Sequence, residues 1–486
     1  MKNVESLTVV GGGTAGLISA LILKERTNLN ISLIYSSSIG IVGVGEGSTE
    51  HFKDFMDFVG IKPSEIIKEC DATFKMGVMF DNWINNHKYM HVVGEPFSIY
   101  FGQYHGIYAK QIAENSNYLY ADTHEKNIVD SLSINVDLYS PTNQYHFNTF
   151  KLNEFLKRVA LNKGIKLFDD EIIEVRLDKN GYIDKLVGKK TKYKSDFYID
   201  ATGFQKTLVS KLNVKWKSFS KYLKLNSAIT FPTGDEDNYN FWTLAKAMNS
   251  GWRFKIPTWG RHGNGYIYDN NFITADEAKL EVEKELGHEV EIGKTFQFDP
   301  GALETVWNKN CVAIGLSGSF FEPLEATSIG LSIQQSFLLM DQIQNYDDKT
   351  ISLYNKSFSS MVENIRDFIV LHYLTKRNDT EFWKNILNLE IPESLKYNLE
   401  KWKTKLPHNE DFLNISNYAM FNPANYIVVM AGLNLFDKKK ILQEYNLLSD
   451  KYKDFANQTM GQHFYDKNSI KFMEHKKLLQ IIREIR

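Results

Sequence analysis

Residues 7–26 read LTVVGGGTAGLISALILKER, and this stretch decides the fold. The apolar run at 7–10 predicts a buried strand, and a glycine-rich turn follows at 11–16. Apolar residues at helical spacing then predict a helix over 17–26, and residues 31–35 predict a second strand. A strand, a helix and a strand in this order begin a parallel sheet with covering helices, so the sequence predicts an α/β fold.

The glycine turn has the spacing Gly11-x-Gly13-x-x-Gly16. In a dinucleotide site of this type the first glycine makes the tight turn and the second lets the backbone approach a pyrophosphate. The third allows the helix to pack closely on the strand. The helix N-terminus adds N–H donors and a positive dipole. The carboxylate that usually follows about 20 residues later, to hold the ribose, is missing near Tyr35, where serines follow instead.

The composition is that of an ordinary globular protein. The 486 residues include 57 Lys+Arg and 59 Asp+Glu, a net charge of -2, so no excess of charge draws the chain to nucleic acid or anionic lipid. No window of about 18 apolar residues predicts a membrane span. Two cysteines, Cys70 and Cys311, and no secretory leader predict a reduced cytoplasmic protein. The oligomeric state stays open, a homo-oligomer included.

The rest of the chain predicts two parts. Residues 1–345 form an α/β module in which 205–300 are a β-rich insertion. Residues 346–486 are mainly helical and are expected to cover the substrate side, helped by residues 80–145.

Two later segments favour FAD over NAD as the dinucleotide. Residues 196–203 (DFYIDATG) resemble the strand-plus-ATG segment of flavoproteins of the hydroxylase superfamily, and residues 311–325 (CVAIGLSGSFFEPLE) resemble their third flavin segment. This resemblance implies a Rossmann-type FAD-binding module with a parallel sheet. No second strand–GxGxxG–helix unit is present for NADPH, so we expect the electrons to come from a separate partner.

Residues 251–257 (GWRFKIP) resemble the GWxWxIP signature of the flavin-dependent tryptophan halogenase family. Four further segments resemble the family in the same order: VGVGEGST at 42–49, DATFKMG at 71–77, FFEPLEATSI at 320–329 and RDFIVLHY at 366–373. On these five segments the chain is identified as a member of that family.

The resemblance implies a reaction. A separate NAD(P)H-dependent flavin reductase supplies reduced FAD, and FAD, O2 and a halide ion (chloride, bromide or iodide) give hypohalous acid. This acid passes inside the protein to a lysine, and electrophilic halogen then attacks an electron-rich aromatic small molecule of the indole or phenol type. Lys75 matches the family's lysine and Glu325 its assisting glutamate, while Thr327 and Ser328 match its halide site.

Each of these residues also has a structural interpretation. Lys75 lies among apolar neighbours, where partial desolvation would favour a nucleophilic amine; alternatively its stem simply covers apolar surface. Glu325 could polarise the halogenating species or take the ring proton, or it could be a carboxylate that stabilises a helix start. Thr327 and Ser328 could bind halide through backbone N–H groups, or their hydroxyls could cap the helix.

The resemblance also implies a cofactor site and a substrate site. The cofactor-binding residues are Gly11, Gly13, Thr14, Ala15, Gly16, Gly43, Gly45, Glu46, Gly203, Gly315 and Leu316. The residues that wall the substrate or screen it from the flavin are Phe97, Trp252, Phe254, Ile256, Pro257 and Phe421. Phe254 replaces the second tryptophan of the family's signature.

No metal site is predicted. His87 and His91 are four residues apart but lack the glutamate of HExxH and a third ligand, so we interpret them as surface or core histidines. His372 is expected to be a packing histidine. Two alternative functions stay open: an FAD-dependent aromatic monooxygenase that hydroxylates its substrate, and a flavin-binding protein without turnover, which the missing carboxylate near Tyr35 favours.

Overall fold

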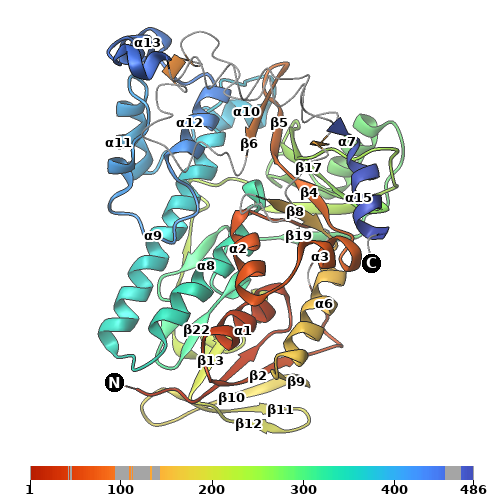
Figure 1. The fold of residues 1–486 in the computed structure, drawn as a ribbon, viewed down its shortest axis with the longest axis vertical. Helices are drawn as coiled ribbons and strands as arrows, with labels where there is room; N and C mark the ends of the chain where they lie inside the picture. Colours follow the sequence, from red (N-terminus) through yellow and green to blue (C-terminus); the bar gives the residue numbers. More distant parts are fainter. Residues whose placement is uncertain are drawn as a thin grey trace.

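The strand–helix–strand unit at the N-terminus lies in a six-stranded sheet at the base of the molecule (Figure 1). The structure is a computed structural model that describes residues 2–41, 43, 46–92, 109–110, 112, 132–133, 143–454 and 472–484. In spatial order the strands are β21 (Trp307–Asn308), β22 (Cys311–Ala313), β13 (Phe197–Asp200), β1 (Ser6–Val10), β2 (Asn30–Tyr35) and β9 (Lys166–Asp169). Neighbours from β22 to β9 run parallel, and β21 is antiparallel to β22. The predicted parallel sheet is confirmed.

Helices cover this sheet because parallel strands are buried on both faces. α1 (Thr14–Arg26) contacts α8 (Thr327–Gln342) and α6 (Thr149–Asn162). The middle of α1 is buried continuously from Gly16 to Leu23, which explains why its sequence is apolar on all sides rather than amphipathic. The side-chain oxygen of Asn148 accepts hydrogen bonds from two backbone N–H groups at the start of α6.

A second, seven-stranded sheet takes strands from residues 205–300 and from residues 77–92. In spatial order its strands are β19 (Lys294–Gln297), β15 (Ser227–Thr233), β18 (Arg261–Tyr268), β17 (Gly251–Thr258), β16 (Thr243–Ala247), β5 (Gly77–Ile84) and β6 (His87–Val92). The insertion also holds the helix α7 (Ala275–Leu286). α7 begins with a capping box between Thr274 and Glu277 and ends at Gly287 in the left-handed region, a sequence signal of a helix inside the β-rich stretch.

Several short sheets accompany the two large ones. One has the order β3 (Glu46–Gly47), β8 (Gln144–Phe147) and β4 (Thr73–Lys75). The others are β10 (Ile172–Leu177), β11 (Ile183–Gly188) and β12 (Lys192–Tyr193); β14 (Trp216–Ser218), β20 (Gly301–Leu303) and β23 (Ser319–Phe320); and β7 (Leu132–Ser133) with β24 (Phe472–Met473). Helices α2 (Glu50–Val59) and α3 (Pro63–Glu69) lie between β3 and β4 in the chain, and the short 3-10 turns are Gly203–Gln205, Val209–Leu212, Gly315–Ser317, Leu324–Ala326 and Asn409–Phe412.

The C-terminal part is mainly helical. Its helices are α9 (Asp348–His372), α10 (Glu381–Ile386), α11 (Glu393–Trp402), α12 (Pro423–Gly432), α13 (Lys438–Asn446) and α15 (His475–Glu484). α12 contacts β6 of the seven-stranded sheet, whereas α15 returns to α3 on the opposite side of the molecule from α13 (Figure 1). Within the described residues, no helix is both long and apolar enough to cross a membrane.

Candidate functional site

Two cavities contain most of the predicted site residues, and the larger of them opens at the carboxyl ends of β1, β2 and β13. Its volume is about 480 Å³, and its lining includes Gly11 to Ala15 at the N-terminus of α1. Gly11 has φ 118°, and a Cβ there would lie 2.1 Å from the carbonyl oxygen of Ala201, so only glycine fits. A Cβ on Gly13 would meet no atom within 4 Å, so that backbone faces the open cavity. This arrangement suits a pyrophosphate at a helix N-terminus.

The sequence has no carboxylate after β2, but acidic side chains that follow β9 lie beside the end of β2. Tyr35 pairs with Asp169 in the parallel register, which brings Asp170 and Glu171 to the cavity wall beside Tyr35 and Ser36. Asp170 already accepts hydrogen bonds from the Tyr193 hydroxyl and from three backbone N–H groups. Glu171 is therefore the acidic group with most freedom to hold a ribose hydroxyl, although Lys189 pairs with it at 2.8 Å.

Turns around Gly203 and Gly315 also line the larger cavity, and a Cβ on Gly315 would lie 2.7 Å from the Cβ of Ala15 at the start of α1. Asp200 at the end of β13 holds these turns in place. Its carboxylate accepts hydrogen bonds from the backbone N–H and hydroxyl of Thr202, from the Ser317 hydroxyl and from the backbone N–H groups of Leu208 and Val209. The DATG segment that favoured FAD thus has a physical role, because its aspartate anchors the loop that lines the cavity.

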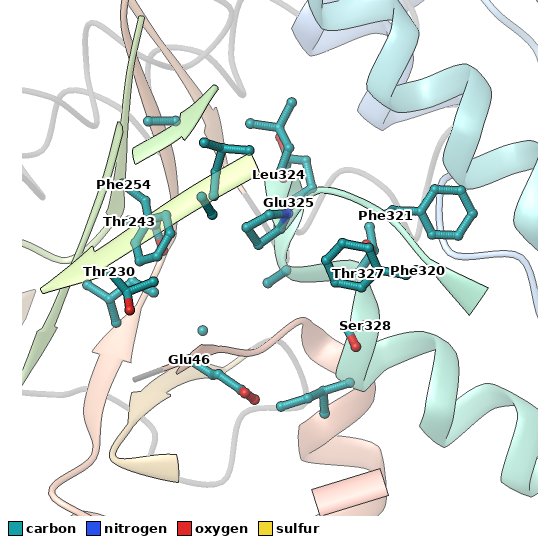
Figure 2. Close-up of a pocket in the computed structure, with 18 of the residues that line it drawn as sticks. Glu46, Thr230, Thr243, Phe254, Phe320, Phe321, Leu324, Glu325, Thr327 and Ser328 are labelled. Carbon is teal, nitrogen blue, oxygen red and sulfur yellow. The ribbon is translucent and has the colours of Figure 1, made fainter. Parts of the chain in front are cut away.

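A smaller cavity of about 210 Å³ adjoins the larger one, with which it shares lining residues. Figure 2 shows residues that line this smaller cavity. Both cavities are lined by Glu46, Phe204, Leu316, Ser328 and Ile329. Most of the smaller cavity's wall is aromatic or aliphatic, and its further lining residues include Lys75, Thr230, Thr243, Trp252, Phe254, Ile256, Phe296, Phe298, Phe320, Phe321, Glu325 and Thr327. Burial raises the pKa of Glu46, at the junction of the two cavities, to about 7.

Lys75 reaches the smaller cavity from β4. It is 1% exposed, and its ammonium donates a hydrogen bond to the backbone oxygen of Ser48 at 2.6 Å. Burial lowers the pKa of Lys75 to about 8, although the charges of Glu325 and Glu50 act in the opposite direction. The side chain therefore does not extend to solvent along an apolar surface, and its amine is available near neutral pH.

Glu325 lies in an unusual turn between Pro323 and α8. Its φ is 67° and that of Ala326 is 56°, and each left-handed L-residue costs roughly 1–2 kcal/mol. The Oε1 atom contacts His91 Nδ1 at 2.8 Å and His372 Nε2 at 3.1 Å. Burial alone would raise the pKa of Glu325, but the two histidines outweigh it and hold the pKa well below its usual range.

Glu322, three residues earlier, has the opposite environment. It is 1% exposed and accepts hydrogen bonds from the Tyr373 hydroxyl at 2.5 Å and from Trp252 Nε1 at 3.0 Å. Burial raises the pKa of Glu322 to about 7, more than these two neutral donors lower it. Glu322 does not line either cavity, but it fixes the ring of Trp252, which does.

The start of α8 follows this turn. Ala326 is the N-cap residue in the left-handed region, and no side chain caps the helix there. The backbone N–H groups at Thr327 and Ser328 are thus not satisfied by a capping side chain, and both residues line the smaller cavity. Figure 2 shows Glu325, Thr327 and Ser328 in succession along this turn.

The remaining predicted site residues divide into four groups. Thr14, Ala15, Gly203, Gly315 and Leu316 line the larger cavity, and Trp252, Phe254 and Ile256 line the smaller one. Gly16, Gly43, Pro257 and Phe421 line neither cavity. Gly45 and Phe97 lie outside the described residues.

The predicted residues that line neither cavity have other contacts. A Cβ on Gly16 would lie 2.0 Å from the Gly11 backbone oxygen, so Gly16 allows close packing of α1. The Pro257 oxygen accepts a hydrogen bond from Thr73. Phe421 stacks on Phe368 at 3.9 Å between ring centroids, behind the residues that surround Glu325.

Sequence reasoning missed the roles of His91 and His372. His372 is buried and hydrogen-bonded, as expected of a packing histidine, but one of its partners is Glu325. His91 comes from β6, His372 from the end of α9 and Glu325 from the turn before α8. No spacing in the chain signals a contact among three such distant elements.

Comparisons with known proteins identify the family. Residues 6–444 match the family model described as tryptophan halogenase. The chain belongs to the tryptophan halogenase family. Tryptophan 6-halogenase SttH from Streptomyces toxytricini is 29% identical over 472 residues, which cover 89% of this chain and 90% of that protein.

Solved structures of halogenases have the same fold as this chain. A flavin-dependent halogenase from Xanthomonas campestris is 26% identical, with a TM-score of 0.83 and 99% of each chain covered. The tryptophan halogenase from Shewanella frigidimarina has the same fold, with a TM-score of 0.85, 24% identity, and 99% of this chain and 98% of that chain covered. The predicted family and the predicted α/β FAD-binding fold are confirmed, and the chain is a flavin-dependent halogenase, an oxidoreductase. Membership implies FAD as cofactor, an aromatic substrate and a separate flavin reductase.

Proposed function

We propose that this halogenase uses reduced FAD, O2 and a halide to halogenate an electron-rich aromatic small molecule of the indole or phenol type, with Lys75 passing on the halogen. The single observation that carries the proposal is the position of Lys75 and Glu325. Both are buried, both line the same apolar cavity, and that cavity adjoins the larger cavity at Leu316 and Ser328.

The residues of the larger cavity fit FAD. The exposed backbone at Gly13 and the N-terminus of α1 would hold the pyrophosphate, and Glu171 with Ser36 would hold the ribose end. Gly203, with its neighbours Gly315 and Leu316, would contact the flavin end, next to the smaller cavity. Reduced FAD with O2 supplies the oxidising power that converts a halide ion into hypohalous acid.

The halide would lie at the start of α8. Uncapped N–H groups and the positive end of the helix dipole suit a monovalent anion. At Thr327 and Ser328 this anion would lie in the smaller cavity, beside its junction with the larger one. The apolar rings of Trp252 and Phe254 would keep water and substrate away from the junction.

Lys75 would receive the oxidised halogen in one of two ways. As an ammonium, it would donate a hydrogen bond to hypohalous acid; as an amine, it would take the halogen and release water, giving an N-halo lysine. In the second case the N–halogen bond breaks as the ring carbon forms its bond to halogen. The carboxylate of Glu325 would remove the proton that the ring carbon loses, and this proton would replace the halogen on the lysine nitrogen, so that the amine is restored.

The pH profile distinguishes these two roles of Lys75. With a pKa of about 8, Lys75 is mostly ammonium below that pH and mostly amine above it. The rate of halogenation rises through about pH 8 if the amine reacts, and falls if the ammonium is needed as a donor.

The test of the proposed function is a product survey. Indoles and phenols are incubated with chloride, bromide or iodide, FAD, a separate flavin reductase with NADH, and air, and the products are analysed by mass spectrometry. We expect halogenated products whose isotope pattern follows the added halide. A hydroxylated product that forms without halide would contradict the proposal and support a monooxygenase.

A cytoplasmic location is also proposed. Both cysteines, Cys70 and Cys311, are buried and unpaired, as expected of a protein kept in reducing surroundings. Cell fractionation with an antibody to the chain tests this.

A further inference from the structure

The protons around Glu325 can be assigned from its neighbours. Two imidazoles face the same carboxylate oxygen, Oε1, and both are essentially removed from solvent. Each ring nitrogen must be either a donor or an acceptor, and the partner on the far side of each ring decides which.

His91 is the first ring, and a chain of hydrogen bonds fixes its tautomer. The backbone N–H of Asn422 can only donate, so the Asn425 oxygen that it contacts at 2.8 Å must be Oδ1. The amide nitrogen of Asn425 then faces His91 Nε2 at 3.1 Å and donates to it. Nε2 is therefore an acceptor without a proton, and the ring proton lies on Nδ1, which donates to Glu325 Oε1. His91 is a neutral imidazole in this arrangement.

His372 is the second ring, and both of its nitrogens face acceptors. Nδ1 lies 2.8 Å from the backbone oxygen of Phe368, which can only accept, so Nδ1 carries a proton. Nε2 lies 3.1 Å from Glu325 Oε1. A further proton must lie between these two atoms, either on the carboxyl or on the imidazole. If it lies on the imidazole, His372 is a cation and Glu325 an anion.

The surroundings favour the ion pair. An imidazole is more basic than a carboxylate by about two pKa units in water, and the donor from His91 stabilises a negative Oε1 further. Among the described residues, Lys75 on β4 and Tyr89 on β6 are further titratable groups that interact electrostatically with Glu325. The ammonium of Lys75 favours a negative Glu325. Burial, together with the charge of Glu325, raises the pKa of Tyr89 well above its usual value, so Tyr89 stays neutral.

We propose that His372 is a buried imidazolium and a positioning residue for halogenation, which holds Glu325 as a carboxylate in its strained turn. Both histidines contact Oε1 of Glu325, so neither contacts its second oxygen, Oε2. The Glu325 side chain lines the smaller cavity. The ion pair thus connects the end of α9 to the turn before α8 and keeps a base facing the cavity. The role in turnover rests on the proposed function, whereas the protonation state does not.

The protonation state is tested without turnover. The protein is labelled with 15N in the histidine rings, and long-range 1H–15N spectra are recorded from about pH 6 to about pH 8.5, with His91 and His372 assigned from single variants. At pH 7 we expect both ring nitrogens of His372 to carry protons, and the ring proton of His91 to lie on Nδ1. A neutral His372 in the unmodified protein at pH 7 would overturn the proposal.

The positioning role is tested with His372→Gln, which keeps a donor near Glu325 but removes the charge. The pKa of Glu325 rises in this variant, so its carboxylate is lost as the pH falls. We expect halogenation to be reduced and the deficit to grow as the pH falls, because a larger share of Glu325 is then protonated in the variant than in the unmodified protein. The matched control is His262→Gln, another buried histidine, on β18, that lines neither cavity.

Two results would contradict the positioning role. One is a deficit that does not change with pH, as a purely structural histidine would give, and the other is no deficit at all. Because the spectra need no substrate, a protein that shows the imidazolium but makes no halogenated product contradicts the proposed function and leaves the protonation assignment in place.

Discussion

The two adjoining cavities are built in opposite ways. The larger one is lined by backbone, with Gly11 and Gly13 at the start of α1, and by the carboxyl ends of parallel strands. The smaller one is lined by aromatic and aliphatic side chains among which Lys75 and Glu325 are buried. The first suits a large polar molecule held by fixed dipoles, and the second suits a small reactive species that water must not reach.

This difference determines where ionisation matters. Backbone N–H groups do not titrate, so the part of the larger cavity built on Gly11 and Gly13 should be insensitive to pH, whereas Glu46 at the junction of the two cavities has a pKa raised by burial to about 7. In and around the smaller cavity, burial moves the pKa of Lys75 down to about 8 and that of Glu322 up to about 7, while the histidines hold the pKa of Glu325 low. Lys75 and Glu322 therefore change protonation near neutral pH, whereas Glu325 stays a carboxylate.

The largest expected effect is in the smaller cavity. Lys75→Met removes the amine but keeps the apolar stem, so we expect halogenation to fall by about 10³-fold or more, about 4 kcal/mol in activation free energy. Oxygen consumption in the presence of reduced FAD should continue, because the larger cavity is unchanged. Product analysis and an oxygen electrode give the two rates, and halogenation near the unmodified rate would remove Lys75 from the mechanism.

The same substitution should stabilise the fold. Burying an ammonium costs free energy, and a pKa lowered from 10.5 to about 8 corresponds to roughly 3 kcal/mol at 1.36 kcal/mol per unit. This cost is complete below about pH 8, where Lys75 is charged in both the folded and the unfolded protein. It disappears as the pH rises towards 10.5, where the unfolded protein also loses the charge. Denaturant unfolding of Lys75→Met should show the gain at pH 7 and a smaller gain at pH 10; an equal gain at both would contradict the pKa shift.

Glu325→Gln tests the base in the smaller cavity. We expect the rate of halogenation to fall by about 10²-fold with the fold intact, since general base catalysis typically contributes this much or more. Glu322→Gln is the matched control, because the same change three residues earlier leaves an oxygen to accept from Trp252 and Tyr373. Equal losses in the two variants would show that the effect belongs to the turn rather than to the carboxylate.

The smallest expected effect is in the larger cavity. Gly13→Val places a side chain into open space, so the apoprotein should fold normally while its affinity for FAD falls by about tenfold. Gly11→Ala is the contrasting variant, because its Cβ would collide with Ala201 and the left-handed φ is strained, so stability should fall. Calorimetry and thermal unfolding separate the two, and unchanged FAD affinity in Gly13→Val would place the pyrophosphate elsewhere.

Much of the fold could be predicted because its signals are local. The glycine turn at 11–16 and the apolar runs beside it depend on residues close in the chain. The helix α7 was missed inside the β-rich stretch although Thr274 and Glu277 form a capping box there. The carboxylates beside Tyr35 were missed because they follow β9, and strand order within a sheet cannot be deduced from the end of β2 alone.

By itself the sequence determined the α/β class, the dinucleotide turn and the family, since each depends on short segments with fixed chemistry. The tertiary structure alone decided the ionisation of the candidate site. It brings His91, His372 and Glu325 together from three distant elements and excludes water around Lys75. The physical reason is that a pKa depends on burial and on neighbouring charges in space, and neither is a property of a residue's place in the chain.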